Sequence, residues 1–189
     1  MGNSCSATTL DRTGRQPVQS LATIMPGLAL VAMSGMPSLA HAVDGCTVLL
    51  CFAAPSWRSI PQCVPPIQQV LRDLARGKPF PTCAMAGAGN SANHAWASAP
   101  GYCPPQYTRV SDGESGPIYS CDYTGAVSVS ISGAPFARTW WSMAGYTVTE
   151  FSPAAKTQLG RWETRFDDDY AVWLESLPPP ATATANPNP

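Results

Sequence analysis

The chain has 189 residues, and its 11 basic and 12 acidic side chains give a formal net charge of −1. The basic side chains form no run in the sequence, so the charge pattern does not favour direct binding to nucleic acid. This length is enough for a leader followed by one domain with a single hydrophobic core.

Residues 1–42 have the three-part layout of a secretory signal peptide. Two arginines come first, an apolar stretch follows over 21–32, and small residues lead to Ala40 and Ala42. These alanines fit the A-x-A pattern at which signal peptidase cleaves, so the mature chain is predicted to begin at Val43. We therefore expect export from the cytoplasm.

Two other interpretations of this leader are disfavoured by its sequence. A membrane anchor needs about 20 apolar residues with few breaks, whereas prolines, glycines and a serine interrupt this stretch between 26 and 37. A lipoprotein needs small or apolar residues just before its cysteine, and Asp44 lies among the residues that precede Cys46. We expect no stable membrane anchor after cleavage.

The mature chain is predicted to contain three disulfides, because exported chains with an even number of cysteines usually pair them. None of these cysteines has the C-x-x-C spacing of a zinc site, and His94 is the only histidine after residue 42. Neither a metal nor a cofactor is therefore expected. The six predicted structural residues are Cys46, Cys51, Cys63, Cys83, Cys103 and Cys121.

Two helices are predicted at the start of the mature chain. Asp44 is placed to cap the first, over 44–54, because its side chain can accept from the free amides of the first turn. The second helix has apolar residues at helical spacing from Ile67 to Leu74, and Gly77 ends it.

The cysteines around these helices limit the disulfide pairing. Cys46 and Cys51 would lie about 7.5 Å apart along one helix axis and on different faces, too far for one bridge. Each must then pair elsewhere, and Cys63 and Cys83 stand just before and just after the second helix. We favour Cys51–Cys63 with Cys46–Cys83, which staples the helices into a hairpin. The reverse assignment is nearly as good, and the sequence does not choose between them.

Residues 84–102 are rich in alanine, glycine, serine and asparagine without a period, which predicts a loop in which His94 is solvated. Strands are predicted over 107–110, 118–121 and 126–131, joined as an antiparallel meander. The meander therefore follows the helical hairpin in the chain.

Cys103 and Cys121 flank the first hairpin of this meander, and a bridge between them would clamp its open end. One or two further strands are predicted around Trp140 and Trp141 and over residues 146–151. Burial in a sheet is the default interpretation of the tryptophan pair. The alternative is contact with a partner, because tryptophan and tyrosine often anchor protein interfaces.

The last ordered element is predicted to be helical, capped by Ser152 and broken at Gly160. Asp167 to Asp169 are interpreted as a solvated acidic face, because the glycine and distal glutamate of an EF-hand are missing. Residues 178–189 are rich in proline and are predicted to be a disordered tail. The aromatic residues of the helix fall on one stripe: Trp162, Phe166, Tyr170 and Trp173.

These elements predict an α+β fold. A disulfide-stapled helical hairpin comes first, a small antiparallel β-meander follows, and an amphipathic helix ends the ordered chain. All of them belong to a single mature domain over 43–177, since this length suits one core.

None of the usual catalytic motifs occurs in the sequence, and no thiol stays free if all six cysteines pair. The only candidate for a catalytic pair of carboxylates that could cleave peptidoglycan is Glu114 together with Glu150 or Asp122. A glycosidase needs an acid in an apolar pocket, whereas Glu114 lies in the most polar turn of the chain. We therefore predict a non-enzymatic protein without catalytic residues; a peptidoglycan-active enzyme or inhibitor is the alternative.

The sequence DGCTVLLC begins at Asp44. It is followed by Cys63, by an amphipathic segment that ends at Leu74, and by the sequence PFPTC that ends at Cys83. Over residues 43–85 this pattern resembles the TrbM/KikA family of conjugal transfer proteins. The resemblance implies a plasmid-borne periplasmic protein acting with the mating-pair formation apparatus, the type IV secretion channel of conjugation. Its partners would be protein components of that channel or pilus. No catalytic residue is implied, and the cysteines of the pattern take a structural role.

Overall fold

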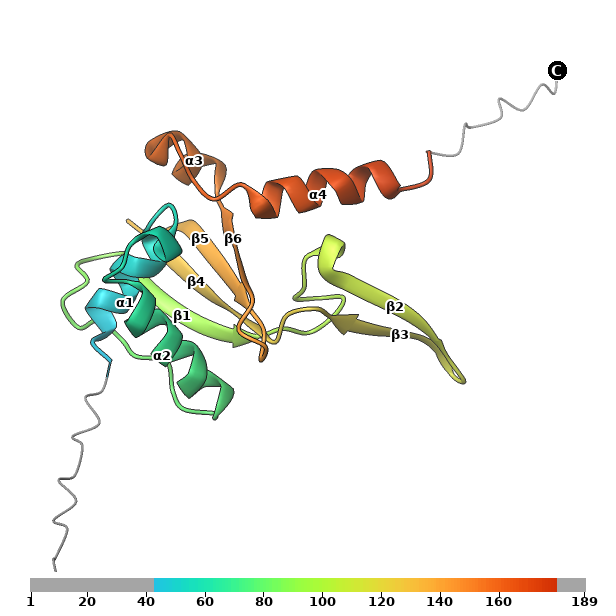
Figure 1. Cartoon of the computed structure of the whole chain (residues 1–189), viewed down its shortest axis with the longest axis horizontal. Coiled ribbons are helices and arrows are strands. Elements are labelled where there is room, and N and C mark those ends of the chain that lie inside the picture. The colour runs from blue at the N-terminus through green and yellow to red at the C-terminus, as the bar shows by residue number, and fades with distance from the viewer. Residues whose placement is uncertain (1–42, 180–189) are drawn as a thin grey trace, which may run out of the picture. The chain divides into compact units, whose positions relative to one another are not determined.

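The computed structural model describes residues 43–179, so the predicted signal peptide and all but the start of the predicted tail lie outside the described residues. Figure 1 shows α1 and α2 beside the sheet formed by β1, β4, β5 and β6. The α-helices are α1 (Gly45–Ala53), α2 (Val64–Ala75), α3 (Pro153–Leu159) and α4 (Arg165–Ser176), and the short 3₁₀ helices are η1 (Trp57–Ser59) and η2 (Pro105–Tyr107). The strands are β1 (Ser91–Trp96), β2 (Thr108–Gly113), β3 (Gly116–Cys121), β4 (Gly125–Ile131), β5 (Ala134–Trp141) and β6 (Thr147–Phe151).

Local sequence signals position the first two helices as predicted. The Asp44 carboxylate accepts hydrogen bonds from the backbone amides of Cys46 and Thr47, so it caps α1. The apolar stripe of α2, from Ile67 to Leu74, is buried against the core. The two helices therefore pack through the faces that their sequence pattern indicates.

Two disulfides tie α1 to both ends of α2. Cys46 pairs with Cys83, in the segment after α2, and Cys51 pairs with Cys63, immediately before α2. This is the favoured pairing, and the reverse assignment is wrong. The stapled helical hairpin is confirmed.

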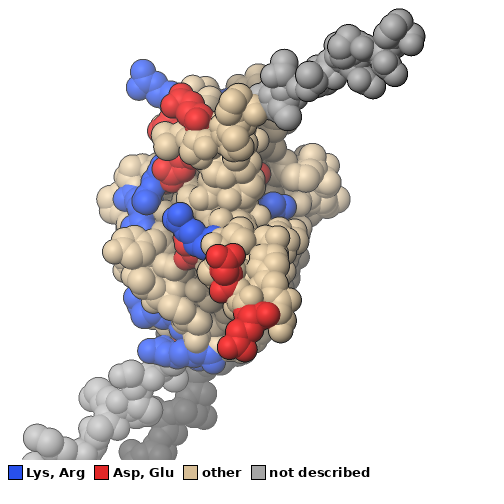
Figure 2. All heavy atoms as spheres, turned by 90° about the vertical axis from the view of Figure 1, so that its right-hand side faces the viewer, with Lys and Arg blue, Asp and Glu red and all other residues tan. Residues whose placement is uncertain are grey.

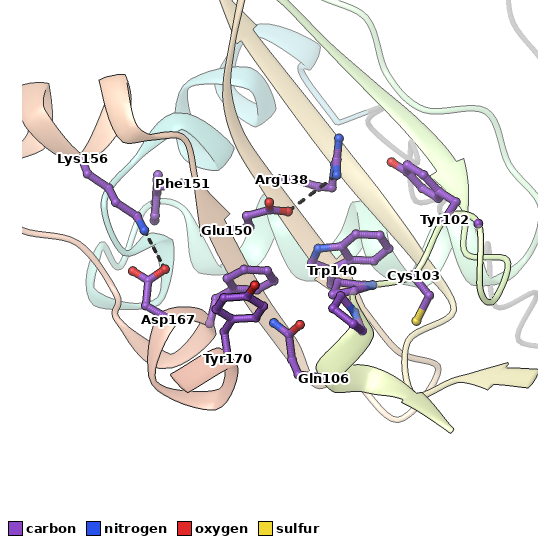
Figure 3. Close-up of a pocket in the computed structure, with 14 residues that line it drawn as sticks. Tyr102, Cys103, Gln106, Arg138, Trp140, Glu150, Phe151, Lys156, Asp167 and Tyr170 are labelled. Atoms are coloured by element: carbon purple, nitrogen blue, oxygen red, sulfur yellow. Dashed lines mark hydrogen bonds and ion pairs between the residues drawn. The ribbon is translucent and has the colours of Figure 1, made fainter. Parts of the chain in front are cut away.

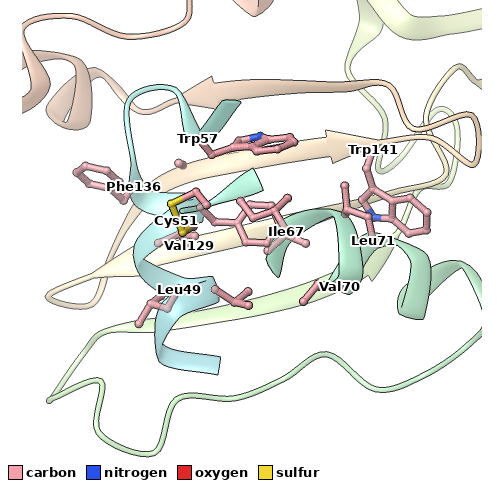
Figure 4. Close-up of a cluster of buried hydrophobic side chains, with 14 of the residues drawn as sticks. Leu49, Cys51, Trp57, Ile67, Val70, Leu71, Val129, Phe136 and Trp141 are labelled. Carbon is pink, nitrogen blue, oxygen red and sulfur yellow. A yellow bond between two sulfur atoms is a disulfide. The ribbon is translucent and has the colours of Figure 1, made fainter. Parts of the chain in front are cut away.

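The main sheet is antiparallel, with strand order β1–β4–β5–β6. Successive residues of a strand point to opposite faces, and two neighbouring pairs in β4 and β5 follow this rule. Val127 and Trp141 belong to the core under α1 and α2, where Figure 4 shows Trp141 beside Leu71. Ala126 and Trp140 lie in a second apolar cluster with Tyr107 of η2. The sheet thus separates two cores.

β1 lies inside the segment predicted to be a loop, so that prediction is wrong. All six of its residues pair with β4, from Ser91 opposite Ser130 to Trp96 opposite Gly125. Small and polar residues favour strands weakly, but here the pairing with a central strand decides the conformation. His94 is therefore partly buried in a strand instead of solvated in a loop.

The three strands predicted to form one meander exist but divide between two sheets, and the antiparallel meander of the main sheet is β4–β5–β6. β2 and β3 pair with each other in a sheet of their own, and β4 pairs with β1 on one side and β5 on the other. Both edges of β4 are occupied, so β3 has no edge to join. The Cys103–Cys121 disulfide closes the base of the β2–β3 hairpin as predicted. The α+β class is confirmed.

The C-terminal helices begin and end at their predicted signals. The Ser152 hydroxyl accepts from the Ala155 amide at the start of α3, and Gly160, with φ of 67°, follows its end. α4 runs from Arg165, and none of its side chains is fully buried. No helix within residues 43–179 is long and apolar enough to cross a membrane.

Candidate functional site

Trp140 and Trp141 are not available as contacts for a partner. Trp140 is 2% exposed and Trp141 is 1% exposed. The two indoles point to opposite faces of the main sheet and fill its two cores. The default interpretation, burial in a sheet, is therefore correct, and the alternative of an exposed partner contact is wrong.

A cleft of about 550 Å³ lies on the side of the main sheet that carries Trp140. Its walls come from β5, β6, η2 and the segment before η2, and from α3 and α4 (Figure 3). This volume falls within the roughly 300–1,000 Å³ of small-molecule sites. We define these walls and the space between them as the sheet cleft.

The charged residues of the sheet cleft are paired with one another. Arg138 Nη1 lies 3.6 Å from Glu150 Oε2, and Lys156 Nζ donates to Asp167 Oδ1 at 2.6 Å (Figure 3). The guanidinium of Arg138 also lies over the ring of Tyr102, 5.3 Å from its centroid. The lining therefore holds two positive and two negative side chains and has no net charge.

Two side chains of the sheet cleft carry buried polar atoms without hydrogen-bond partners among the described residues. These atoms are Oε1 and Nε2 of Gln106 and Nε1 of Trp140. Nearly all buried polar groups in proteins are hydrogen-bonded, so each exception calls for a specific explanation. Figure 3 shows Gln106 reaching from η2 toward the space between Tyr170 and Trp140.

α4 is held in place by two of the three consecutive aspartates. The Tyr107 hydroxyl donates to Asp169 at 2.7 Å, and burial, then this hydrogen bond, raises the pKa of Tyr107 far above its ordinary value. Asp167 accepts from Lys156 and from the indole of Trp162. The prediction of a solvated acidic face is therefore wrong for Asp167 and Asp169, which fix α4 against η2 and α3.

The carboxylates weighed for peptidoglycan cleavage lie in three different environments. Glu114 is exposed in the turn between β2 and β3. Asp122 accepts from Arg109 beside the hairpin base, and Glu150 pairs with Arg138 in the sheet cleft. Glu114 thus lacks the apolar pocket that a glycosidase acid requires.

Residues 43–179 also contain no group of three or more side chains placed to hold a metal ion.

The β2–β3 hairpin exposes large apolar side chains. Val110 is 60% exposed, Ile118 57% and Tyr119 44%. Val110 and Tyr119 are directly opposite each other, so they share one face of the hairpin. No other strand of the described region pairs with β2 or β3, which leaves unpaired backbone groups along both outer edges.

Acidic and basic side chains are interspersed on the side of the molecule shown in Figure 2.

His94 is the titratable group whose environment differs most from the sequence prediction. Its ring centroid lies 4.8 Å from that of Trp96 and 5.6 Å from that of Trp141. Its Nε2 is buried and has no hydrogen-bond partner in the described part of the chain. Burial lowers the pKa of His94 below its ordinary value of 6.5.

Acidification below about pH 6.5 is expected to destabilise the protein through His94. The unfolded chain takes up this proton at higher pH than the folded chain, so the free energy of unfolding falls as pH drops through this range. Thermal denaturation between about pH 7.5 and pH 5 measures the effect, above the range where ordinary carboxylates titrate. A His94→Phe variant, which cannot titrate, should lose most of this decline. Parallel curves for both proteins would contradict the assignment.

The sequence signals did not single out the polar residues that line the sheet cleft. Tyr102, Gln106, Arg138 and Lys156 come from separate elements, and no local pattern links them. Comparison of the chain with models of protein families, with curated proteins and with solved structures found no match. The functional argument therefore depends on the residues of this chain.

Proposed function

We propose that this protein is an exported, non-enzymatic accessory component of bacterial conjugation. It acts in the periplasm with the mating-pair formation apparatus and binds a protein component of the channel or pilus. The observation that carries the binding role is the β2–β3 hairpin, which has two free strand edges and apolar side chains that the fold does not bury.

The disulfides support a site of action outside the cytoplasm. The core under α1 and α2 is closed by Cys46–Cys83 and Cys51–Cys63, and the hairpin base by Cys103–Cys121. Cytoplasmic reductants keep such pairs as thiols, so the stapled fold depends on an oxidising compartment. The predicted signal peptide at 1–42 is consistent with this requirement.

The hairpin is well suited to receive an extended segment of a partner. An isolated two-stranded hairpin is only marginally stable in water, but the Cys103–Cys121 bridge and the Arg109–Asp122 ion pair, with an N–O distance of 2.7 Å, hold its base. A partner strand can therefore add to a preformed edge through main-chain hydrogen bonds. The exposed pair of Val110 and Tyr119 then contacts its side chains.

The resemblance to the TrbM/KikA family supports conjugation as the process. It rests on the cysteines and apolar residues between Asp44 and Cys83. The four cysteines in this pattern all take part in the two bridges that join α1 to the ends of α2. The pattern thus coincides with one disulfide-linked unit of this protein.

A clean deletion strain is expected to show a lower mating frequency, restored by the wild-type gene. A Val110→Lys/Ile118→Lys variant should fail to restore it, because two charges replace the exposed apolar side chains of the hairpin and disfavour strand addition. The loss should be at least about tenfold, which corresponds to about 1.4 kcal/mol of binding free energy. The same variant should no longer co-isolate with channel subunits from crosslinked cells.

The matched control is Leu50→Lys/Met143→Lys, which adds the same charges at exposed apolar positions outside the hairpin. Leu50 is 71% exposed and Met143 is 61% exposed, close to the 60% of Val110 and 57% of Ile118. This control should restore transfer at equal protein abundance. Normal transfer from the deletion strain would end the proposal, and equal loss from both variants would remove the hairpin as the binding surface.

A further inference from the structure

We propose that the outer edge of β3 pairs with the same edge of a second copy of this chain, which joins the two-stranded sheets of both copies into one. The pairing is antiparallel, and the twofold axis of the dimer passes between the Tyr119 residues of the two copies. The inference does not depend on a role in conjugation. The outer edge of β2 stays free in this dimer, so a channel component can still add its strand to the hairpin.

Alternate residues of the β2–β3 hairpin turn their backbone groups outward. The Asp122 amide donates to the Tyr107 carbonyl at 2.9 Å, so these two residues form a hydrogen-bonded pair at the base of the hairpin. Hydrogen-bonded and non-hydrogen-bonded pairs alternate along an antiparallel ladder, and the register of β2 and β3 has no irregularity. The N–H and C=O groups of Tyr119 and Cys121 therefore point away from β2. Pro117 occupies the third outward position of β3, where the ladder requires no N–H.

The outward groups of β3 are complementary to those of a second copy. In an antiparallel pair centred on Tyr119, the Tyr119 residues of the two copies exchange both of their main-chain hydrogen bonds. The Cys121 N–H of each copy then donates to the Pro117 carbonyl of the other. This register uses the N–H groups of Tyr119 and Cys121 in both copies. The missing N–H of Pro117 costs only the reciprocal bond to the Cys121 carbonyl.

The side chains of β3 also favour pairing with a copy of itself. The strand has the sequence GPIYSC, so it carries no charge, and Ile118 and Tyr119 are 57% and 44% exposed. Directly opposite residues share a face of a sheet, so two Tyr119 rings meet at the axis and each Ile118 lies opposite a Ser120. Val110, which lies opposite Tyr119 within the hairpin, extends this apolar row on both sides. The dimer therefore covers apolar side chains without bringing like charges together.

The outer edge of β2 is less suited to pairing with its own copy. Thr108, at its first outward position, donates its N–H to the Pro105 carbonyl, so η2 occupies that end of the edge. The other outward residues are Val110 and Asp112. Pairing centred on Ser111 would use their groups, but it would place two Asp112 carboxylates diagonally across the pair. Charged side chains protect strand edges from self-pairing. In Figure 1, β2 lies on the side of the hairpin toward α4 and β3 lies on the opposite side.

The dimer is tested by sedimentation velocity on the purified oxidised mature protein. We expect the sedimentation coefficient to rise toward that of a dimer between about 1 and about 300 µM protein, because small interfaces give weak association. A coefficient that stays at the monomer value over this range would overturn the proposal. It would leave the proposed role in conjugation intact, because the mating experiments measure binding to a channel component.

Two proline variants identify the edge that forms the dimer. Tyr119→Pro removes an outward N–H of β3 and the side chain at the axis, while the hydrogen bonds between β2 and β3 remain. The dissociation constant of the dimer should rise at least tenfold. The matched control is Val110→Pro, because Val110 lies directly opposite Tyr119 and its N–H points outward from β2. This control should dimerise with nearly wild-type affinity. Equal loss in both variants, or no loss in Tyr119→Pro, would exclude the edge of β3 as the interface.

Two charge variants test the register of the pairing. Tyr119→Lys and Tyr119→Glu each place like charges opposite each other at the axis, so each variant alone should stay monomeric. An equimolar mixture should recover the dimer, because lysine then faces glutamate. Tyr119 is 44% exposed, so both variants should melt close to the wild-type temperature. A mixture of the two folded variants that stays monomeric would overturn the pairing at Tyr119.

Discussion

A Cys46→Ala/Cys83→Ala variant is expected to lose about 4 kcal/mol of its free energy of unfolding. The two cysteines are 37 residues apart, and closing a loop of this length contributes about this amount through the entropy of the unfolded chain. The bridge also holds a close contact in the folded state. A Cβ on Gly45 would overlap the backbone carbonyl of Thr82, so this close approach of α1 to the segment requires a glycine. Urea denaturation of the oxidised variant measures the loss.

The matched comparison is Cys51→Ala/Cys63→Ala. These cysteines are 12 residues apart, so the loop contribution falls to about 3 kcal/mol. Both residues are buried in the core, which adds the cost of lost packing. Each variant should unfold at lower urea than wild type. A Cys46→Ala/Cys83→Ala variant as stable as wild type would show that this bridge is dispensable for stability.

The helical part of the fold could be predicted because its signals are local. Asp44 lies where a capping side chain is needed, and the spacing from Ile67 to Leu74 fixes the buried face of α2. The helical geometry also excluded a bridge between Cys46 and Cys51, and each of these cysteines pairs elsewhere. The choice between the favoured pairing and its reverse needs the distances between the helices, and the sequence does not contain them.

The sheet could be predicted only in part because strand pairing is non-local. The residues of β4 alternate as a strand should, but nothing in them specifies β1 as a neighbour. Strand β1 has a composition typical of a loop, and it becomes a strand through its pairing with β4. The sheet cleft is also non-local, because its walls come from η2 and α4, which the Tyr107–Asp169 hydrogen bond joins.

The tryptophan pair shows how composition can mislead about surfaces. Six tryptophans in a short chain suggest that some of them are exposed and contact a partner protein. Alternation along β5 instead sends Trp140 and Trp141 into two separate cores, so adjacent aromatics in a strand indicate a sheet covered on both faces. The exposed apolar side chains of the hairpin, by contrast, belong to valine, isoleucine and tyrosine.

Trp141→Ala is accordingly expected to destabilise the protein by about 3–5 kcal/mol, the range for truncation of a buried aromatic residue. Trp141 is 1% exposed, and its ring contacts those of His94 and Trp96 at the end of the main core. The loss should appear as a lower urea midpoint in the purified mature protein. Part of the pH dependence assigned to His94 should disappear as well, because the cavity admits water to the imidazole and reduces its desolvation.

The matched control is Trp96→Ala, which removes the same side chain from the neighbouring position in the cluster. Trp96 is 51% exposed, so it contributes less buried area, and its removal should cost about 1 kcal/mol or less. A partner-contact role for Trp141 predicts the opposite pattern, with stability unchanged and co-isolation of partners lost. Equal stabilities for wild type and Trp141→Ala would therefore indicate that the tryptophan pair is exposed, and would contradict the description of a sheet with a core on each face.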